Sequence, residues 1–372
     1  MVLSSGQNLH ELPQYYSAPD MVRTKVHEKG PVYAVIAAAL FGVSTPLSKL
    51  LLGDIDPVLF AALLYLGSGV GLFLAGRIRR TGKGVQKEAR LDSADYPWLA
   101  GAILAGGVIA PISLLYGLQA TPAATASLLL NLEIVTTTLI AYFIFAESVG
   151  HRVLVAISVI TVAGIVLSGN VSGQPGFPIA ASGIILAGIF WGIDNNLTRK
   201  IAGKDPLAIA TVKGFGAGGV SLVIALLTHA HVPGFLVAAA AMGIGFFTFG
   251  LSIVFFARSL RDLGAARTSA YFAAAPFIGS IISVVVFRTM PDMQFVIALL
   301  LFLAGVLLLV SERHMHSHVH ERMVHVHRHR HDEHHMHAPP GELDREHTHE
   351  HVHEPIDHEH PHMPDIHHRH EK

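Results

Sequence analysis

Long apolar stretches separated by short polar ones run through the first 311 residues of the chain. A helix that crosses a membrane needs roughly 20 mostly apolar residues. Windows of that length predict ten transmembrane helices, at residues 32–52, 57–76, 97–117, 124–145, 151–169, 179–198, 206–227, 235–256, 268–287 and 293–310. Beyond the last of them, large apolar residues become rare. The pattern therefore predicts an all-α integral membrane protein that ends in a polar tail.

The charged residues are few and unevenly distributed. Only 14% of the 372 residues are charged, against about 25% in a typical soluble protein. The tail, residues 312–372, holds 13 acidic residues, 7 basic residues and 21 of the 26 histidines, so its net charge is −6 with neutral histidine. The rest of the chain carries +5. The absence of cysteine excludes disulfides, iron–sulfur centres and thiolate metal sites.

Lysine and arginine lie in alternate connections between the predicted helices. Six of them lie in the loop 77–96, and others follow the fourth, sixth and eighth helices. The opposite loops contain one arginine and no lysine. Because positive residues favour the cytoplasmic side of a membrane, we expect the N-terminal segment 1–31 and the tail 312–372 to be cytoplasmic. Residues 1–20 could also precede the natural start, since Met21 opens a basic stretch that leads into the first helix.

The two halves of the chain resemble each other. The segment FGVSTPLSK at 41–49 aligns with WGIDNNLTR at 191–199, and ATASL at 124–128 aligns with ARTSA at 266–270. Five helices per half is an odd number, so the second copy is inverted in the membrane. Inverted repeats are typical of secondary transporters, whose binding site lies near the midplane between the repeats. We predict repeats at 32–169 and 179–311, joined by an outer linker at 170–178.

The sequence ASLLLNLEIV at 126–135, followed by FAE at 145–147, resembles the fourth helix of EamA-type permeases in the drug/metabolite transporter superfamily. The stretch 191–206 is similar to their sixth helix. The resemblance implies ten helices in two inverted five-helix repeats, in the cytoplasmic (inner) membrane of a prokaryote. It also implies secondary transport of small organic solutes, often export. Two positions depart from the pattern: Ile134 replaces a proline that Pro276 keeps in the second half, and no acid matches Glu147 there.

Ionisable residues inside predicted helices are costly and therefore candidates for function. Glu133 lies near the middle of the fourth helix, where a carboxylate could take up and release a proton during transport. It could equally be a structural acid that is hydrogen-bonded to a neighbouring threonine or tyrosine. Lys49, near the outer end of the first helix, is better explained as an anchor that reaches the headgroups.

The second polar cluster is Asp194-Asn195-Asn196 in the sixth helix. It could coordinate a cation, bind an amino or hydroxyl group of a substrate, or lie near the cytoplasmic headgroups. Lys213 could reach the membrane surface, but pairing with Asp194 is the favoured hypothesis. The full set of candidates for the substrate path is Asn131, Glu133, Trp191, Asp194, Asn195, Asn196, Lys213 and Tyr271.

Histidines recur at every second position in parts of the tail, which lacks the apolar residues to form a core and is predicted to be disordered. Neutral imidazole suits zinc, nickel, cobalt and copper. The candidate metal ligands are His314, His316, His318, His320, His325, His327, His329, His331, His334, His335, His337, His347, His349, His351 and His353. The bound metal could regulate transport or be its cargo. A pH sensor and a tolerated low-complexity repeat are further interpretations.

These features favour a transporter over an enzyme, since the chain contains no HExxH, GxSxG or GxxxxGK[ST] motif. The preferred hypothesis is an exporter of a small organic metabolite such as an amino acid, with a metal-binding regulatory tail. A divalent metal efflux carrier (zinc, nickel or cobalt) and a non-transporting membrane sensor of metal or pH remain alternatives. The expected partners are the lipid bilayer, the solute and metal ions on the tail. No nucleic acid and no required cofactor are expected, and a homodimer stays open.

Overall fold

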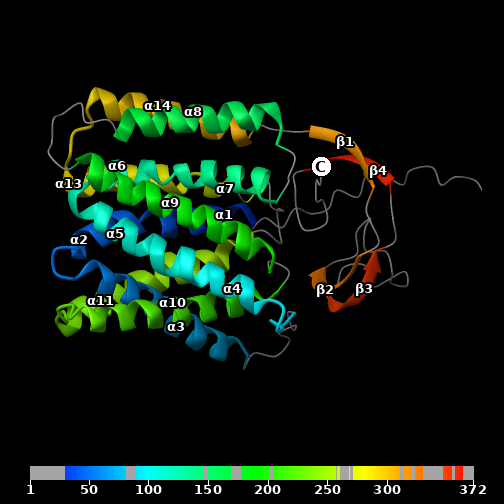
Figure 1. Ribbon diagram of the computed structural model, residues 1–372, viewed down its shortest axis with the longest axis horizontal. Helices are drawn as coiled ribbons and strands as arrows, with labels where there is room; N and C mark the ends of the chain where they lie inside the picture. The colour runs from blue at the N-terminus through cyan, green and yellow to red at the C-terminus, as the bar shows by residue number, and fades with distance from the viewer. Residues whose placement is uncertain are drawn as a thin grey trace, which may run out of the picture.

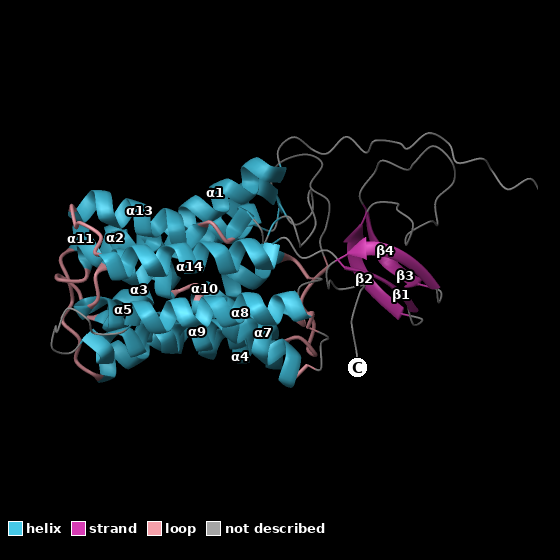
Figure 2. Ribbon diagram, turned by 90° about the horizontal axis from the view of Figure 1, so that it is seen from above, coloured by secondary structure: helices cyan, strands magenta, loops and turns pink. Residues whose placement is uncertain are grey.

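The computed structural model describes residues 30–80, 89–145, 149–168, 177–201, 204–256, 258–259, 268, 271–310 and four tail segments. The described part of 30–310 forms a bundle of helices and contains no strand (Figures 1 and 2). The first half consists of α1 (Gly30–Gly42), α2 (Ser44–Leu51), α3 (Pro57–Arg80), α4 (Tyr96–Ala102), η1 (Ile103–Ile109), α5 (Ala110–Ala120), α6 (Ala123–Leu129), α7 (Leu132–Phe143) and α8 (His151–Ser168). The second half consists of α9 (Phe177–Arg199), α10 (Pro206–Leu227), α11 (Phe235–Ile244), η2 (Gly245–Leu251), α13 (Ala275–Phe287) and α14 (Met293–Val310).

Many of these helices are long and apolar enough to cross a membrane. In the described residues, seven stretches meet both conditions: Gly30–Leu51, Pro57–Ile78, Tyr96–Ala120, Ala123–Phe143, His151–Ser168, Pro206–Leu227 and Phe235–Phe256. The 23-residue α9 and the shorter apolar helices Ala275–Phe287 and Met293–Leu309 fall on the other three predicted spans. The architecture is therefore that of a multi-pass helical membrane protein, as the apolar pattern predicts.

The helix contacts between the two halves come in matched pairs. Helix α9 packs on η1 and α7, while α1, at the equivalent place in the other half, packs on η2 and α13. Likewise α10 contacts η1, and α3 contacts η2. The pairs α3–α10 and α8–α14 join equivalent helices of the two halves, and α6–α13 joins the two equivalent broken spans. This exchange of partners is what two inverted repeats would produce, and it brings α7, α9, α10 and η1 together at the centre.

Glycines allow helices α3 and α10 to pack backbone against backbone. A side-chain carbon added at Gly214 would lie 2.5 Å from the backbone N and Cα of Gly69 on the facing helix. Neither backbone can move away without separating two long helices. Close approach through small residues is a common way to stabilise helix pairs in membranes, where apolar burial drives association less than in water.

Gly214→Ala is therefore expected to destabilise the protein by roughly 1–3 kcal/mol, the usual cost of overpacking. Gly219→Ala in the same helix is the matched control, because a side-chain carbon there meets nothing within 4 Å. Thermal unfolding of the purified protein in detergent should show a lower midpoint for the first variant only. Equal midpoints for the two variants would contradict the close α3–α10 packing.

The structure describes four segments of the tail as strands. Strand β1 (His314–Val319) pairs antiparallel with β4 (Asp357–His362), and β2 (Met323–His329) pairs antiparallel with β3 (His347–His353). Alternation with a period of two, present in the histidine runs, suits such an extended strand. Disorder of the tail as a whole stays a prediction. The strands lie beyond the end of the bundle where α3 and α9 end in arginine (Figures 1 and 2).

Candidate functional site

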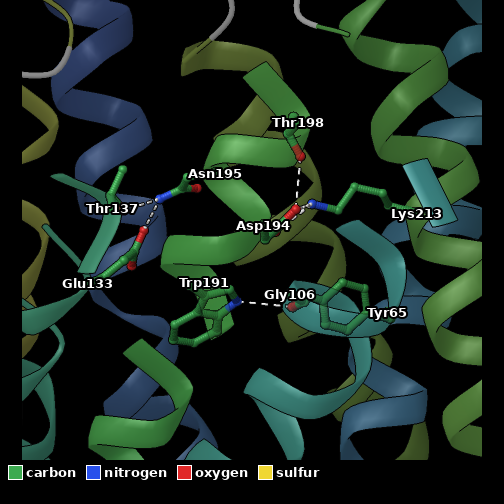
Figure 3. Close-up of polar contacts among 9 residues, drawn as sticks. All are labelled: Tyr65, Gly106, Glu133, Thr137, Trp191, Asp194, Asn195, Thr198 and Lys213. Carbon is green, nitrogen blue, oxygen red and sulfur yellow. Dashed lines mark hydrogen bonds and ion pairs between the residues drawn. The ribbon is translucent and has the colours of Figure 1, made fainter. Parts of the chain in front are cut away.

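Polar side chains from three elements meet around the last turns of α9. Successive residues of a helix point in different directions, so Asp194 faces α10 and η1 while Asn195 faces α7 (Figure 3). The site thus has two carboxylates, one on each side of α9. Each has a different kind of partner.

Asp194 forms a buried ion pair with Lys213 of α10. The lysine Nζ donates to both carboxylate oxygens at 2.7 Å, and the Thr198 hydroxyl donates to Oδ1 at 2.8 Å. The side chains are only 9% and 12% exposed. Burying two charges is tolerable when they are paired and their remaining oxygens are hydrogen-bonded, and both conditions hold here.

Glu133, in the first turn of α7, has neutral partners. Asn195 donates its Nδ2 to the glutamate Oε1 at 2.7 Å and also lies 3.2 Å from the Thr137 hydroxyl oxygen (Figure 3). Glu133 is half-buried, whereas Asn195 is exposed at the surface of the helical bundle. Among the described contacts, the hydrogen-bond partner of the Glu133 carboxylate is therefore an amide. It is neither a cation nor the threonine or tyrosine of the structural hypothesis.

An aromatic wall closes one side of the site. The carbonyl oxygen of Gly106 accepts hydrogen bonds from the Trp191 Nε1 at 3.0 Å and from the Tyr65 hydroxyl at 2.7 Å (Figure 3). Gly106 lies in η1, a π-helical stretch, and such stretches occur often at functional sites. A side-chain carbon at position 106 would overlap the Asp194 carboxyl group, so the close approach of η1 to α9 requires glycine there.

The other polar residues singled out in the sequence have different surroundings. Asn196 is buried and donates to the carbonyl oxygens of Thr137 and Gly192, so it joins α9 to α7 without facing the carboxylates. Asn131 is fully buried two residues before Glu133. Tyr271 is 42% exposed, and none of the described polar contacts joins it to the cluster. Lys49 donates to the carbonyl oxygens of Leu118 and Gln119 at the end of α5, which agrees with its position near a helix end.

Four residues of the site were not among the sequence candidates: Tyr65, Gly106, Thr137 and Thr198. Thr137 follows Glu133 by one helical turn within a run of three threonines, and this spacing was a usable signal. Thr198 likewise follows Asp194 by one turn. Tyr65 and Gly106 carried no such signal, because they lie in other helices and meet Trp191 only in the folded chain.

Glu147, which the family pattern highlights, lies outside the described residues. Five candidate metal ligands also lie outside the described residues: His320, His331, His334, His335 and His337. The other candidate histidines are described by the pairing of their strands. Opposite positions pair histidine with histidine three times in each ladder: His314–His362, His316–His360 and His318–His358 in one, His325–His351, His327–His349 and His329–His347 in the other.

A multi-pass helical bundle with inverted-repeat contacts and polar groups at span depth has the architecture of a secondary transporter. Comparison with known proteins agrees. The model of the EamA-like transporter family matches residues 28–169 and 178–311, and the chain belongs to this family, which fits the drug/metabolite transporter superfamily.

Two individual proteins show the same relationship. An uncharacterized transporter of Methanothermobacter thermautotrophicus is 29% identical over 298 residues, which cover 75% of this chain and 85% of that one. One solved crystal structure superposes with a TM-score of 0.55 at 18% identity, covering 75% of this chain and 95% of the other. At that identity the second likeness concerns the fold alone.

Proposed function

We propose that the protein is a gradient-driven exporter of a small organic metabolite such as an amino acid. In this proposal all ten predicted helices cross the cytoplasmic membrane, and both termini are cytoplasmic. The observation that carries the proposal is the difference between the two central carboxylates: Asp194 is neutralised by Lys213, whereas Glu133 is held by the amide of Asn195.

This difference supports separate roles for the two carboxylates. Both carboxylate oxygens of Asp194 accept from Lys213, so this acid is engaged by a cation. Glu133 is half-buried, and its hydrogen-bond partner among the described side chains is the amide of Asn195. In the proposal Glu133 changes its charge during transport, and this change alters how favourable a bound cationic group is nearby. Asn195 is exposed one helical turn before α9 ends at Arg199, which supports access to Glu133 from that end of the helix. No enzymatic activity is part of the proposal.

Metal efflux is the main alternative, and the described residues favour it less. They contain no group of three or more histidine, cysteine, aspartate or glutamate side chains able to hold a metal ion. The carboxylate oxygens of Asp194 already accept hydrogen bonds from Lys213 and Thr198.

For the tail we propose a regulatory role in which transition metal binds between paired strands. Directly opposed residues of an antiparallel pair have Cβ atoms about 4.5–5.5 Å apart, close enough for two imidazoles to share one ion. The repeated histidine–histidine register of β1–β4 and β2–β3 supports this idea. Zinc, nickel, cobalt and copper all suit imidazole ligands, so the site selects a class of metal and not one metal.

Flux measurements in reconstituted vesicles test both parts. We expect labelled amino acids to cross the membrane, zinc, nickel and cobalt not to cross, and added zinc on the tail side to change the amino-acid flux. A chain truncated after Ser311 should transport without responding to zinc. A second variant tests the strand histidines directly. Replacing His316, His318, His358 and His360 with alanine should weaken the zinc response. Metal flux that Asp194→Asn abolishes would establish metal as cargo and overturn the proposal.

A further inference from the structure

The fourth predicted span is broken between α6 and α7. Around the break, the backbone N–H groups of Asn131, Glu133 and Ile134 donate three residues back, to Leu128, Leu130 and Asn131. In a continuous α-helix, the N–H groups of Asn131 and Glu133 would instead donate four residues back, to the carbonyls of Ser127 and Leu129. Two carbonyl oxygens therefore lose their α-helical donors deep inside the bundle.

Two side-chain oxygens at the same break are also unsatisfied. The Ser127 hydroxyl and the Asn131 Oδ1 are buried and have no hydrogen-bond partner among the described residues. The Asn131 Nδ2, in contrast, donates to the Leu128 carbonyl at 3.0 Å, which fixes the orientation of the amide. Ser127 lies in the last turn of α6 and Asn131 lies directly before α7, so both oxygens lie next to the break. Buried polar atoms without partners are rare and call for an explanation such as a bound ion or water.

Helix α13 packs closely on α6 beside the Ser127 hydroxyl. A side-chain carbon at Gly279 of α13 would lie 3.0 Å from the Ser127 hydroxyl oxygen and would overlap the carbonyl oxygen of Gly42 in α1. Glycine at this position therefore allows α1 and α6 to approach α13. The nearest acid along the chain is Glu133, two residues past Asn131.

The second repeat has the same break but keeps only one of the two side-chain oxygens. Its ninth span is interrupted at residues 273–274, before α13. In the alignment of the repeats, Ser127 corresponds to Ser269, Asn131 to Ala273 and Glu133 to Ala275. A span can therefore be interrupted at this place without the Asn131 amide, which is particular to the first repeat.

We propose that the break in the fourth span binds a monovalent metal cation of about the size of sodium, held by the Ser127 hydroxyl, the Asn131 Oδ1 and the carbonyls of Ser127 and Leu129. Oxygen ligands suit hard cations, and broken transmembrane helices supply such ligands through their freed carbonyls. The set carries no formal charge, and a low-dielectric interior penalises a doubly charged ion without carboxylate ligands far more than a singly charged one. The cation site does not depend on the proposed transport function. A role of the bound cation in driving transport would rest on that function.

Thermal unfolding of the full chain in detergent tests the site. A ligand that binds only the folded state raises the unfolding midpoint with its concentration. We expect sodium chloride to raise the midpoint relative to choline chloride at equal ionic strength. Asn131→Leu and Ser127→Ala should each weaken the apparent sodium affinity roughly 10- to 100-fold, as for a lost contact to a charged group. Asn131→Asp, which keeps the oxygen and loses the Nδ2 donor, should preserve the response.

Ser221→Ala is the matched control. Ser221 is likewise buried with an unpartnered hydroxyl, but it lies within the continuous helix α10. Its variant should respond to sodium as the natural protein does. Equal midpoints in sodium and choline would overturn the proposal and leave water as the occupant, and so would an equal loss of response in the Ser221 variant. Vesicles that show no solute flux beside an intact sodium response would instead contradict only the proposed transport function.

Discussion

Replacing Glu133 with glutamine is expected to reduce pH-driven amino-acid transport to the level of empty vesicles. The substitution preserves the size of the side chain and an oxygen that can accept from Asn195, so the local structure should persist. It removes the group that is proposed to take up and release a proton. If the proton on Glu133 couples the pH gradient to the movement of the bundle, a permanently neutral residue breaks that link.

Exchange of labelled for unlabelled amino acid should survive the same substitution, because exchange needs binding and reorientation but no net proton movement. Reconstituted vesicles with and without a pH gradient measure the two activities on one preparation. Asp92→Asn, which removes an exposed acid far from the centre, is the control and should leave both unchanged. Loss of exchange together with driven transport would assign Glu133 to substrate binding or folding and contradict the coupling role.

The sequence carried most of the information about the helices and about one pair in the site. The length of the apolar runs located the helices. In lipid each helix satisfies its own backbone hydrogen bonds, so each one can be predicted from its own residues alone. The pairing of Lys213 with Asp194 was also predictable, since two opposite charges in apolar helices have few other ways to be satisfied. Both inferences depend on the high cost of polar groups in a membrane.

Contacts between helices that are distant in the sequence could not be predicted in this way. Trp191 and Gly106 are 85 residues apart, and the tryptophan donates to a backbone carbonyl, a group that every residue possesses. Nothing in the sequence marks one carbonyl as the acceptor. Tyr271 is a weaker candidate for a related reason: an aromatic residue in a span indicates packing or an interface as readily as a substrate path. The break in the fourth span could not be predicted either, because Ile134 occupies the position where a proline would have indicated it.

Asp194→Asn is expected to destabilise the protein by about 3–5 kcal/mol, the largest effect on stability among the changes considered. The variant leaves the Lys213 ammonium buried beside a neutral amide, and an uncompensated buried charge accounts for a loss of this size. Lys213→Met added to the same variant should recover much of the loss, because it removes the stranded charge. The midpoint of thermal unfolding in detergent, measured for the single and double variants, gives the comparison.

Lys204 supplies the control for this argument. It pairs with Asp92 and Asp95 at 2.8 and 3.2 Å. The Asp92 side chain is 57% exposed, so water replaces much of what that pair contributes, whereas the Asp95 side chain is 11% exposed. Lys204→Gln should therefore lower the midpoint less than Asp194→Asn does. If the double variant is no more stable than Asp194→Asn, the carboxylate stabilises the fold by something other than neutralising Lys213. The close approach of Gly106 to Asp194 would then be the contact to alter next, since η1 packs directly on that carboxyl group.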